Sequence, residues 1–176
     1  MRGIERTFGV ARQTVASWLK KVQQRPDLKE SVLPAQSDDV LELDELWSFV
    51  RVKINKPWVC IALCRRTRQV IAFVIAGRAT ESGRRLWNKI PAAYKSCHTY
   101  SDFWDAYEKV FSTQTHQSVG KKTGETAHVE RWNNTLRQRL ARYVRKTLSF
   151  SKKTCWHHMM TKFFIYHYNL SVAVNA

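Results

Sequence analysis

Three acidic residues in three separate segments are the side chains of this sequence best suited to hold a divalent metal ion. Asp44 lies in LELDELW, Asp102 in TYSDFWDAY and Glu130 in AHVERWNNTLRQR. They stand in a chain with 30 Lys and Arg against 14 Asp and Glu. A basic protein needs no carboxylates merely to hold polyphosphate, but Mg²⁺ takes oxygen ligands. Since two such ions can bind the attacking and leaving oxygens of a phosphoryl transfer, the three acids indicate metal-assisted cleavage of a phosphodiester.

The rest of the chain is strongly basic, with a formal net charge of +16 and an isoelectric point of about 10.1. This excess predicts an anionic partner, with nucleic acid as the first candidate and an anionic membrane surface as the weaker alternative. After Glu130 the chain has no Asp or Glu but nine Lys and Arg. Without acids for i,i+4 pairs, the repulsion among these cations must be offset by an anion such as a DNA backbone.

Glu130 also begins a polar pattern on an expected helix. Asn134 follows it by one helical turn and Arg137 by about two turns, so the three share one face. This face can extend from a metal site toward DNA, where Arg137 binds a phosphate or orients a terminal base. We expect Arg145, one of the nine cations, to contact DNA as well. Arg137 as an ordinary solvated charge is the alternative.

The segments that carry these acids alternate between strand and helix patterns. Strands are expected in LELDELWSFVRV, WVCIALC and VIAFVIA, joined by tight turns into an antiparallel meander, then in SCHTYSD and within THQSVGKKTGE. Helices are expected in ESGRRLWNKI, FWDAYEKVF, a long segment from about residue 126 to 146, and CWHHMMTKFFIYHYNL. This order is that of the ribonuclease H-like fold, so we predict an α/β domain with a mixed five-stranded sheet flanked by helices.

In that fold the first and fourth strands are neighbours, and the start of the long helix approaches them. Asp44, Asp102 and Glu130 would then converge, and a cluster of like charges is stable only with a cation in it. Four further acids are expected to be ordinary surface charges: Glu42, Glu45, Asp105 and Glu108.

The N-terminal segment has a different character. Residues 1–25 are basic and helical, and FGVARQTVASWLKK resembles the second and third helices of a helix-turn-helix, which would make this a partial motif without its first helix. Arg12, Gln13 and Ser17 would then face DNA. A basic amphipathic helix packed on the surface is the alternative. Residues 26–40 contain two prolines and read as a linker to the domain at 41–176.

Membrane and zinc-site classes are disfavoured by the sequence. No stretch approaches the roughly 18–20 apolar residues of a membrane span, and the N-terminus lacks the apolar core of a signal peptide, so we expect a cytoplasmic protein. None of the four cysteines is spaced as Cys-x-x-Cys. Buried free thiols are therefore expected rather than a structural zinc site.

The segments LDELWSFV, YSDFWDAY and HVERWNNTLRQRLARYVRKTLSFSK resemble the insertion-sequence-one family of bacterial transposases. The resemblance implies a ribonuclease H-like DDE catalytic domain in which Asp44, Asp102 and Glu130 form the metal-binding triad. Arg137 matches the basic residue found seven positions after the Glu in many such enzymes. The implied activity is cleavage at element ends and joining of the 3′-OH to target DNA, with Mg²⁺, or Mn²⁺ in its place. Pairing of two element ends implies a homodimer or a larger assembly on DNA.

Full-length relatives carry a zinc-finger-like segment and a complete helix-turn-helix before the catalytic domain, so the chain resembles their downstream portion. A truncated, inactive DNA-binding regulator of transposition is therefore one alternative. A nuclease acting on RNA–DNA hybrids is another, and the long basic helix and the N-terminal segment argue against it.

Overall fold

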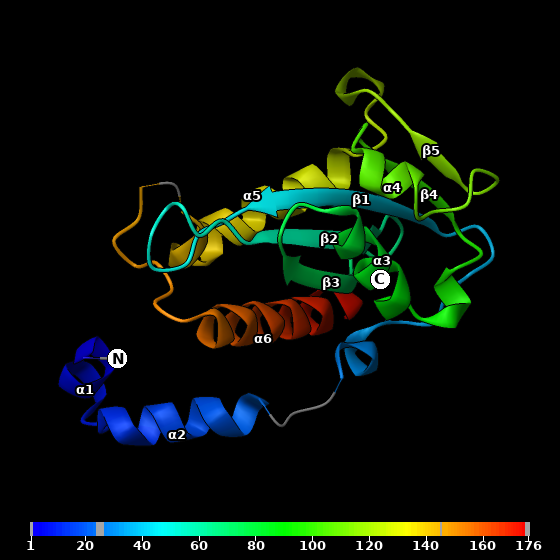
Figure 1. Cartoon of the computed structure of the whole chain (residues 1–176). Coiled ribbons are helices and arrows are strands. Elements are labelled where there is room, and N and C mark those ends of the chain that lie inside the picture. The colour runs from blue at the N-terminus through cyan, green and yellow to red at the C-terminus, as the bar shows by residue number, and fades with distance from the viewer. Residues whose placement is uncertain (1, 24–26, 145, 175–176) are drawn as a thin grey trace.

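The computed structural model of the chain describes residues 2–23, 27–144 and 146–174 (Figure 1). It is an α/β structure with one sheet. The strands are β1 (Val40–Trp47), β2 (Trp58–Cys64), β3 (Val70–Ala76), β4 (His98–Ser101) and β5 (His116–Ser118). The α-helices are α1 (Arg2–Phe8), α2 (Arg12–Gln23), α3 (Thr80–Lys89), α4 (Asp105–Glu108), α5 (Ala127–Arg139) and α6 (Thr154–Ala173). Short 3-10 turns are η1 (Leu28–Ser31), η2 (Ala92–Tyr94), η3 (Lys121–Thr123) and η4 (Ala141–Tyr143).

The sheet has the strand order β3-β2-β1-β4-β5. β1, β2 and β3 are antiparallel neighbours, which confirms the meander, whereas β1–β4 and β4–β5 are parallel pairs. In the parallel register Glu42 lies opposite Tyr100. Asp44 and Asp102 each lie two residues further along, so parallel pairing brings them to the same level of the sheet. This five-stranded mixed sheet is compatible with the ribonuclease H-like fold.

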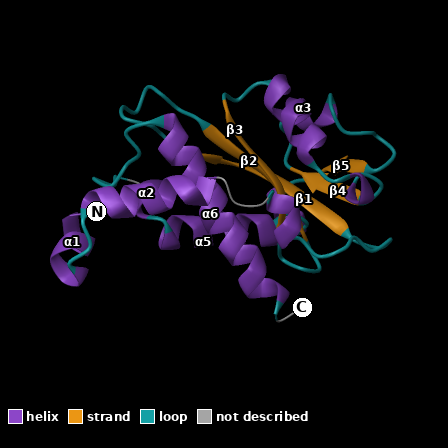
Figure 2. Ribbon diagram, turned by 90° about the horizontal axis from the view of Figure 1, so that it is seen from below, coloured by secondary structure: helices purple, strands orange, loops and turns teal. Residues whose placement is uncertain are grey.

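Alternation along the central strands divides the core into two layers. On β2, Cys60 and Ala62 pack with α3 and α4, whereas Val59 and Ile61 pack with α5 and α6. Figure 2 shows α3 and the pair α5 and α6 on different sides of the sheet. Because successive side chains on a strand point to opposite faces, β1 likewise sends Leu43 to one layer and Leu46 to the other.

Two expected helices are shorter than the sequence pattern indicated. α5 ends at Arg139 rather than near residue 146, because Leu140 has extended backbone and the chain then turns through η4. This turn lets Tyr143 become buried against α6, where its hydroxyl bonds to that of Thr161. The helix expected at 103–111 is reduced to α4, because Asp102 accepts a hydrogen bond from the Trp104 backbone N–H in a local turn.

At the N-terminal end, α1 and α2 are separated by a turn at residues 9–11. Gly9 has φ of 65°, in the left-handed region that favours glycine. The boundary expected between residues 25 and 26 lies outside the described residues. In the segment expected to be a linker, residues 27–40, η1 packs on the domain and Ser31 accepts a hydrogen bond from Gln69.

Three cysteines are buried free thiols as expected, namely Cys60, Cys64 and Cys97, whereas Cys155 is exposed. That part of the cysteine prediction is wrong because residue 155 lies in the solvent-facing first turn of α6. No helix within the described ranges is long and apolar enough to cross a membrane.

Candidate active site

Asp44 lies in the middle of β1 on the face covered by α5. Its carboxylate Oδ2 accepts a hydrogen bond of 2.7 Å from the side-chain amide of Asn133. Asn133 is one helical turn after Glu130, so the same face of α5 presents an amide and a carboxylate to the strand. Strand and helix thus position Asp44 together.

Three carboxylates come together at this point. One oxygen each of Asp44, Glu45 and Asp102 lies within 4.8 Å of the other two. Asp102 reaches the group from the loop that follows β4, which the parallel pairing of β1 and β4 places beside Asp44. The structure therefore brings together two of the three acids singled out in the sequence, and adds Glu45.

Glu45 was expected to be an ordinary surface acid, and this prediction is wrong. Its side chain is 3% exposed, and its Oε1 accepts hydrogen bonds from the Arg78 guanidinium. The guanidinium lies 4.9 Å from the ring centre of Trp58 and 5.5 Å from that of Trp104. Glu45 is buried because an arginine 33 residues away, held between two indoles, supplies its countercharge.

Glu42 was also expected at the surface, but its side chain is 0% exposed. Its Oε2 accepts hydrogen bonds from the backbone N–H groups of His128 and Val129 at 2.9 and 3.0 Å. Its Oε1 binds Arg65 at 2.7 Å and the His128 ring at 2.6 Å. The first N–H groups of a helix have no acceptor within the helix itself. Glu42 of β1 therefore supplies the acceptor for the first turn of α5, the turn that carries Glu130.

Glu130 lies in the first turn of α5 and accepts a hydrogen bond of 3.3 Å from the Thr126 hydroxyl. It is not one of the three acids whose oxygens lie within 4.8 Å of one another. It is near enough for its charge to act on Asp44. The remaining two acids expected at the surface, Asp105 and Glu108, are exposed.

Burial and mutual repulsion change the acidity of this cluster. Burial, followed by the charges of Asp102 and Glu130, raises the pKa of Asp44 to about 6, although the Asn133 amide acts in the opposite direction. Burial and the charges of Asp102 and Asp44 raise the pKa of Glu45 to about 7 against the effect of Arg78. The hydrogen bonds of the cluster therefore do not balance its negative charge. A bound cation would balance it.

The donor set fits a hard divalent cation. Carboxylate oxygens are the ligands that Mg²⁺ and Mn²⁺ prefer. Asp44 and Asp102 form no ion pair with a lysine or arginine among the described residues. Oε2 of Glu45 is buried without a hydrogen-bond partner in the same part of the chain. These acids are therefore able to hold a divalent metal.

The residues expected to bind DNA are distributed over the molecule. Asn134 is exposed, next to the Asn133 that contacts Asp44, and Arg137 is partly buried, with Nη1 donating to the Tyr143 carbonyl at 3.3 Å. Arg145 lies outside the described residues. On α2 the three expected side chains are exposed: Arg12, Gln13 and Ser17. Arg12 also forms an ion pair of 2.9 Å with Glu5.

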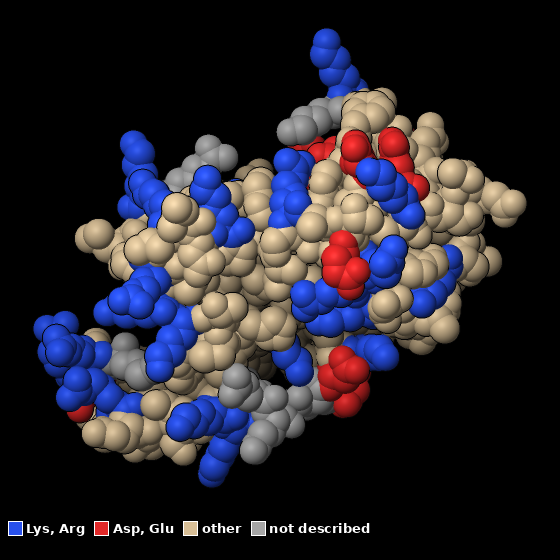
Figure 3. Space-filling model, in the orientation of Figure 1, with Lys and Arg blue, Asp and Glu red and all other residues tan. Residues whose placement is uncertain are grey.

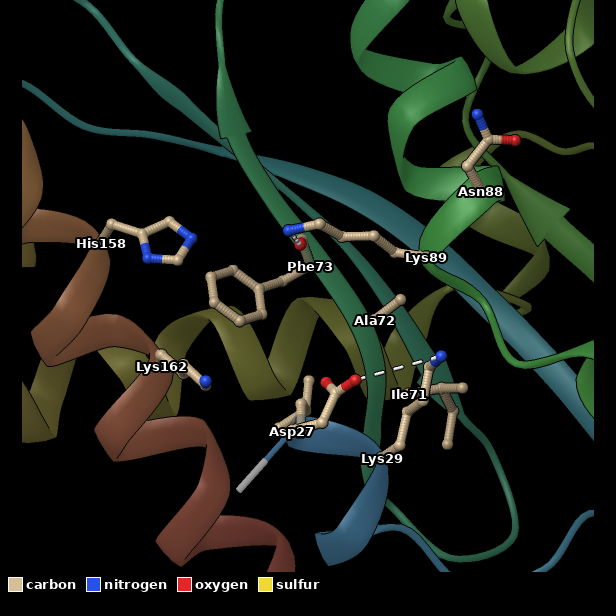
Figure 4. Close-up of a pocket in the computed structure, with 10 residues that line it drawn as sticks. Asp27, Lys29, Ile71, Ala72, Phe73, Asn88, Lys89, His158 and Lys162 are labelled. Atoms are coloured by element: carbon tan, nitrogen blue, oxygen red, sulfur yellow. Dashed lines mark hydrogen bonds and ion pairs between the residues drawn. The ribbon is translucent and has the colours of Figure 1, made fainter. Parts of the chain in front are cut away.

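A separate hollow lies at edge strand β3, between α3 and α6, with a volume of about 250 Å³ (Figure 4). Lys29, Lys89 and Lys162 line it together with His158 and a single acid, Asp27. β3 is two strands away from β1, and none of the clustered carboxylates lines the hollow. It is therefore distinct from the acidic site.

A family model described as IS1 transposase matches residues 40–170 of the chain, a range that contains all the clustered acids and Glu130. The chain is also similar to several named proteins of insertion elements. The insertion element IS1 protein InsB of Shigella flexneri is 35% identical over 116 residues, which cover 66% of this chain and 86% of that protein.

Two further relatives extend the similarity. The insertion element IS1 4 protein InsB of Escherichia coli strain K12 is 33% identical over 135 residues, covering 76% of this chain and 78% of that protein. The insertion element iso-IS1n protein InsB of Shigella dysenteriae is 34% identical over 128 residues, covering 72% and 93%. The range matched by the family model, 40–170, includes the sheet, the acidic cluster and α5.

Proposed function

Because the chain belongs to the IS1 transposase family, we propose that it cuts DNA at the ends of an insertion sequence and joins the cut 3′ ends to target DNA. The observation that carries this proposal is the approach of Asp44, Glu45 and Asp102 to within 4.8 Å beside the helix that bears Glu130. A basic chain with a partly buried acidic cluster suits a reaction on a polyanion, because the cations bind the backbone and the acids serve the cleavage.

The domain that performs this reaction is proposed to be a ribonuclease H-like fold at 41–176. The strand order β3-β2-β1-β4-β5 and the antiparallel meander followed by two parallel pairs support this assignment. Residues 1–25 are proposed as a partial helix-turn-helix and 26–40 as the connection to the domain.

Asp44, Asp102 and Glu130 are the proposed catalytic acids, and they would hold Mg²⁺ or Mn²⁺. When bound, such ions stabilise the charge that develops on the attacking and leaving oxygens of a phosphoryl transfer. The charges of Asp102, from the end of β4, and of Glu130, from α5, both act on Asp44. Its position suits it to act with both.

The protein's own groups keep these acids in place. Asn133 fixes the carboxylate of Asp44 through a hydrogen bond of 2.7 Å. Glu42 fixes the start of α5 and hence the position of Glu130. Arg78 holds Glu45 against the cluster, so this carboxylate acts as a positioning group for its neighbour Asp44.

DNA is the proposed partner of the exposed basic and polar side chains outside the cluster. Asn134, Arg137 and Arg145 would contact the DNA near the cleaved phosphate. Arg12, Gln13 and Ser17 on α2 would contact the element end. Since two ends must be joined in one event, a homodimer or larger assembly is proposed on DNA.

The test is a joining assay with labelled duplex DNA that carries the end of the element encoding this chain. Asp44→Asn, Asp102→Asn and Glu130→Gln are expected to abolish Mg²⁺-dependent cleavage and joining while DNA affinity stays within about twofold, because each removes one ligand charge at the metal. Asp105→Asn, at an exposed acid on α4, is the matched control and should react like the wild type.

Wild-type joining by the Asp44→Asn variant would remove that residue from the catalytic set. A wild-type chain that binds the element end but neither cuts nor joins it would instead support the inactive regulator.

A further inference from the structure

Two loops far apart in sequence form one surface at the end of the sheet. The loop between β1 and β2, residues 48–57, lies beside the loop that precedes α6, at the same end of the molecule (Figure 1). Val50 and Ser151 form a parallel β-bridge, and the Arg51 N–H donates to the Ser151 carbonyl at 2.7 Å. We call residues 48–57 together with 146–153 the paired-loop surface.

Large apolar side chains project from this surface into solvent. Ile54 is 87% exposed, Leu148 is 96% exposed and Val52 is 50% exposed. The Asn55 N–H donates to the Val52 carbonyl at 3.1 Å, which closes a β-turn with Lys53 and Ile54 at its corners. Exposed apolar residues gathered in this way are typical of a binding surface.

The same surface is strongly cationic. Its exposed lysines and arginines are Arg51, Lys53, Lys56, Lys146, Lys152 and Lys153. None of them forms an ion pair within the described ranges, and the chain has no Asp or Glu at residues 46–80 or after Glu130. Figure 3 shows Lys and Arg side chains at the end of the molecule where the two loops lie. A polyanion is therefore the complementary partner.

A histidine of α6 and an aromatic contact join the two loops to each other. The His157 ring of α6 bonds to the hydroxyls of Ser48 and Ser151, one from each loop, at 3.1 and 2.9 Å. The ring of Phe49 contacts that of Phe150, again across the two loops, with ring centres 5.5 Å apart.

Two residues of the paired-loop surface have a left-handed backbone conformation. Arg51 and Lys146 have φ of 64° and 58°, a conformation that non-glycine residues adopt rarely and often at functional sites. A surface fixed in this way presents its apolar residues without a large loss of freedom on binding.

The position of the surface relates it to the acidic cluster. Asp44 lies within β1, and the paired-loop surface begins at Ser48, directly after the C-terminal end of that strand and four residues after Asp44. At about 3.3 Å per residue the strand carries the chain about 13 Å from Asp44 to Ser48. A duplex that places a phosphate at the acids can therefore extend along the sheet onto the paired loops.

We propose that the paired-loop surface is a DNA-bending wedge. Ile54 and Leu148 insert between base steps from the minor groove, and the surrounding cations bind the flanking phosphates. Apolar side chains among cations are the combination by which proteins unstack and kink a duplex. The inference rests on the proposed function only in that the ligand is DNA, and it does not depend on which residues cut it.

The test measures bending without cleavage. A short duplex with the element end and a dye at each terminus is mixed, in EDTA and without divalent metal, with the whole chain carrying Asp44→Asn, and energy transfer between the dyes reports the bend. In this background Ile54→Ser and Leu148→Ser are expected to abolish most of the increase in energy transfer. Val174→Ser, at an apolar residue 85% exposed at the end of α6, is the matched control and should retain it.

The cations give a second, independent readout. Replacement of Lys53 and Lys152 by Ala is expected to lower the slope of log affinity against log salt by about 2, since each phosphate contact contributes about 0.9. The serine variants should leave this slope unchanged, because they remove no charge.

Three results would overturn the proposal. The first is a wild-type bend with Ile54→Ser. The second is binding to phosphatidylserine vesicles that depends on Ile54 while DNA bending does not. The third is a loss of self-association in Ile54→Ser with the bend unchanged, which would make the surface an interface between copies of the chain. Failure of the catalytic proposal would appear in the joining assay alone, and so remains distinguishable.

Discussion

The side-chain amide of Asn133 donates a hydrogen bond of 2.7 Å to the carboxylate of Asp44, which ties α5 to the central strand at the acidic cluster. Asn133 is 6% exposed, so solvent does not offer Asp44 an equivalent donor from this side. A hydrogen bond to a charged acceptor in such a place contributes about 1.5–3 kcal/mol. Asn133 is therefore a positioning residue for the proposed catalytic acid.

We expect Asn133→Ala to lower the joining rate at saturating DNA by about 10- to 100-fold, the kinetic equivalent of that free energy. DNA affinity should change little, because Asn133 is buried. The exposed neighbour Asn134 provides the control: Asn134→Ala should weaken DNA binding and leave the saturated rate near that of the wild type. Equal rate losses in the two variants would contradict the assigned orientation of α5.

Glu42 makes a second connection between β1 and α5. Glu42→Ala removes the acceptor of the His128 and Val129 N–H groups and leaves Arg65 without its buried partner. We expect a loss of about 3 kcal/mol or more in the free energy of unfolding, measured by urea titration. Glu42→Gln keeps an oxygen acceptor and should lose less. Amide exchange at residues 128 and 129 should accelerate in the Ala variant only.

The sequence was sufficient for the sheet and for two of the clustered acids. β1, β2 and β3 follow from their apolar alternation and turn residues, which are local signals. Asp44 and Asp102 follow from the family resemblance and from the adjacency of the first and fourth strands. Glu45 could have been recognised as buried, because it shares with Leu43 the face of β1 that packs against α3 and α4.

Partners distant in the chain account for the errors. Glu42 and Glu45 were assigned to the surface because nothing near them in sequence neutralises them, whereas Arg65 and Arg78 lie 23 and 33 residues away. The end of α5 was placed too late because the periodic pattern continues through Tyr143, although that ring packs against α6 only after a turn. Asn133 was missed because the spacing of residues along the helix does not show which of two adjacent asparagines, 133 or 134, faces the strand.

The acidic cluster should make stability depend on divalent metal. Without added metal, Asp44→Asn is expected to raise the free energy of unfolding by about 1 kcal/mol, because it removes one of several crowded negative charges. For a chain of this size that corresponds to a rise of about 2–4 °C in Tm. With Mg²⁺ or Mn²⁺ the wild type should gain stability and the variant should not.

Thermal unfolding with and without EDTA tests whether metal stabilises the wild type and leaves the Asp44→Asn variant unchanged. Asp105→Asn, at an exposed acid, should follow the wild type under both conditions. An equal rise in Tm on addition of metal to Asp44→Asn and the wild type would remove Asp44 from the metal site.

The pair of Glu45 and Arg78 offers a test of coupling. Arg78→Met leaves the Glu45 carboxylate, 3% exposed, without its countercharge, whereas the guanidinium itself is 44% exposed. Allowing for solvent screening, we expect a loss of about 1–2 kcal/mol in the free energy of unfolding. The double variant Glu45→Gln, Arg78→Met should be more stable than Arg78→Met alone. Additive losses from the two substitutions in urea titration would exclude the coupling.

His157 connects the paired loops to α6 in its neutral form. The Ser48 hydroxyl donates to the Pro57 carbonyl, so it accepts from Nε2 of the ring. The Ser151 hydroxyl accepts from Arg142 and donates to Nδ1. Burial, together with the charge of Arg142, lowers the pKa of His157 from 6.5 to about 4. A protonated ring would carry a second N–H where Ser151 now donates, so this arrangement requires the neutral ring.

Stability should therefore fall as the pH falls from about 6.5 toward 4. In this range the unfolded chain binds a proton at residue 157 that the folded chain does not, so the contribution is complete above 6.5 and is lost on acidification. At about 1.4 kcal/mol for each pH unit between the two values, His157 accounts for about 3–4 kcal/mol. Urea titrations across this range should show a shallower dependence in His157→Gln. His167→Gln, at an exposed position of the same helix, should keep the wild-type dependence. An unchanged dependence in His157→Gln would show that the acid sensitivity arises elsewhere in the chain.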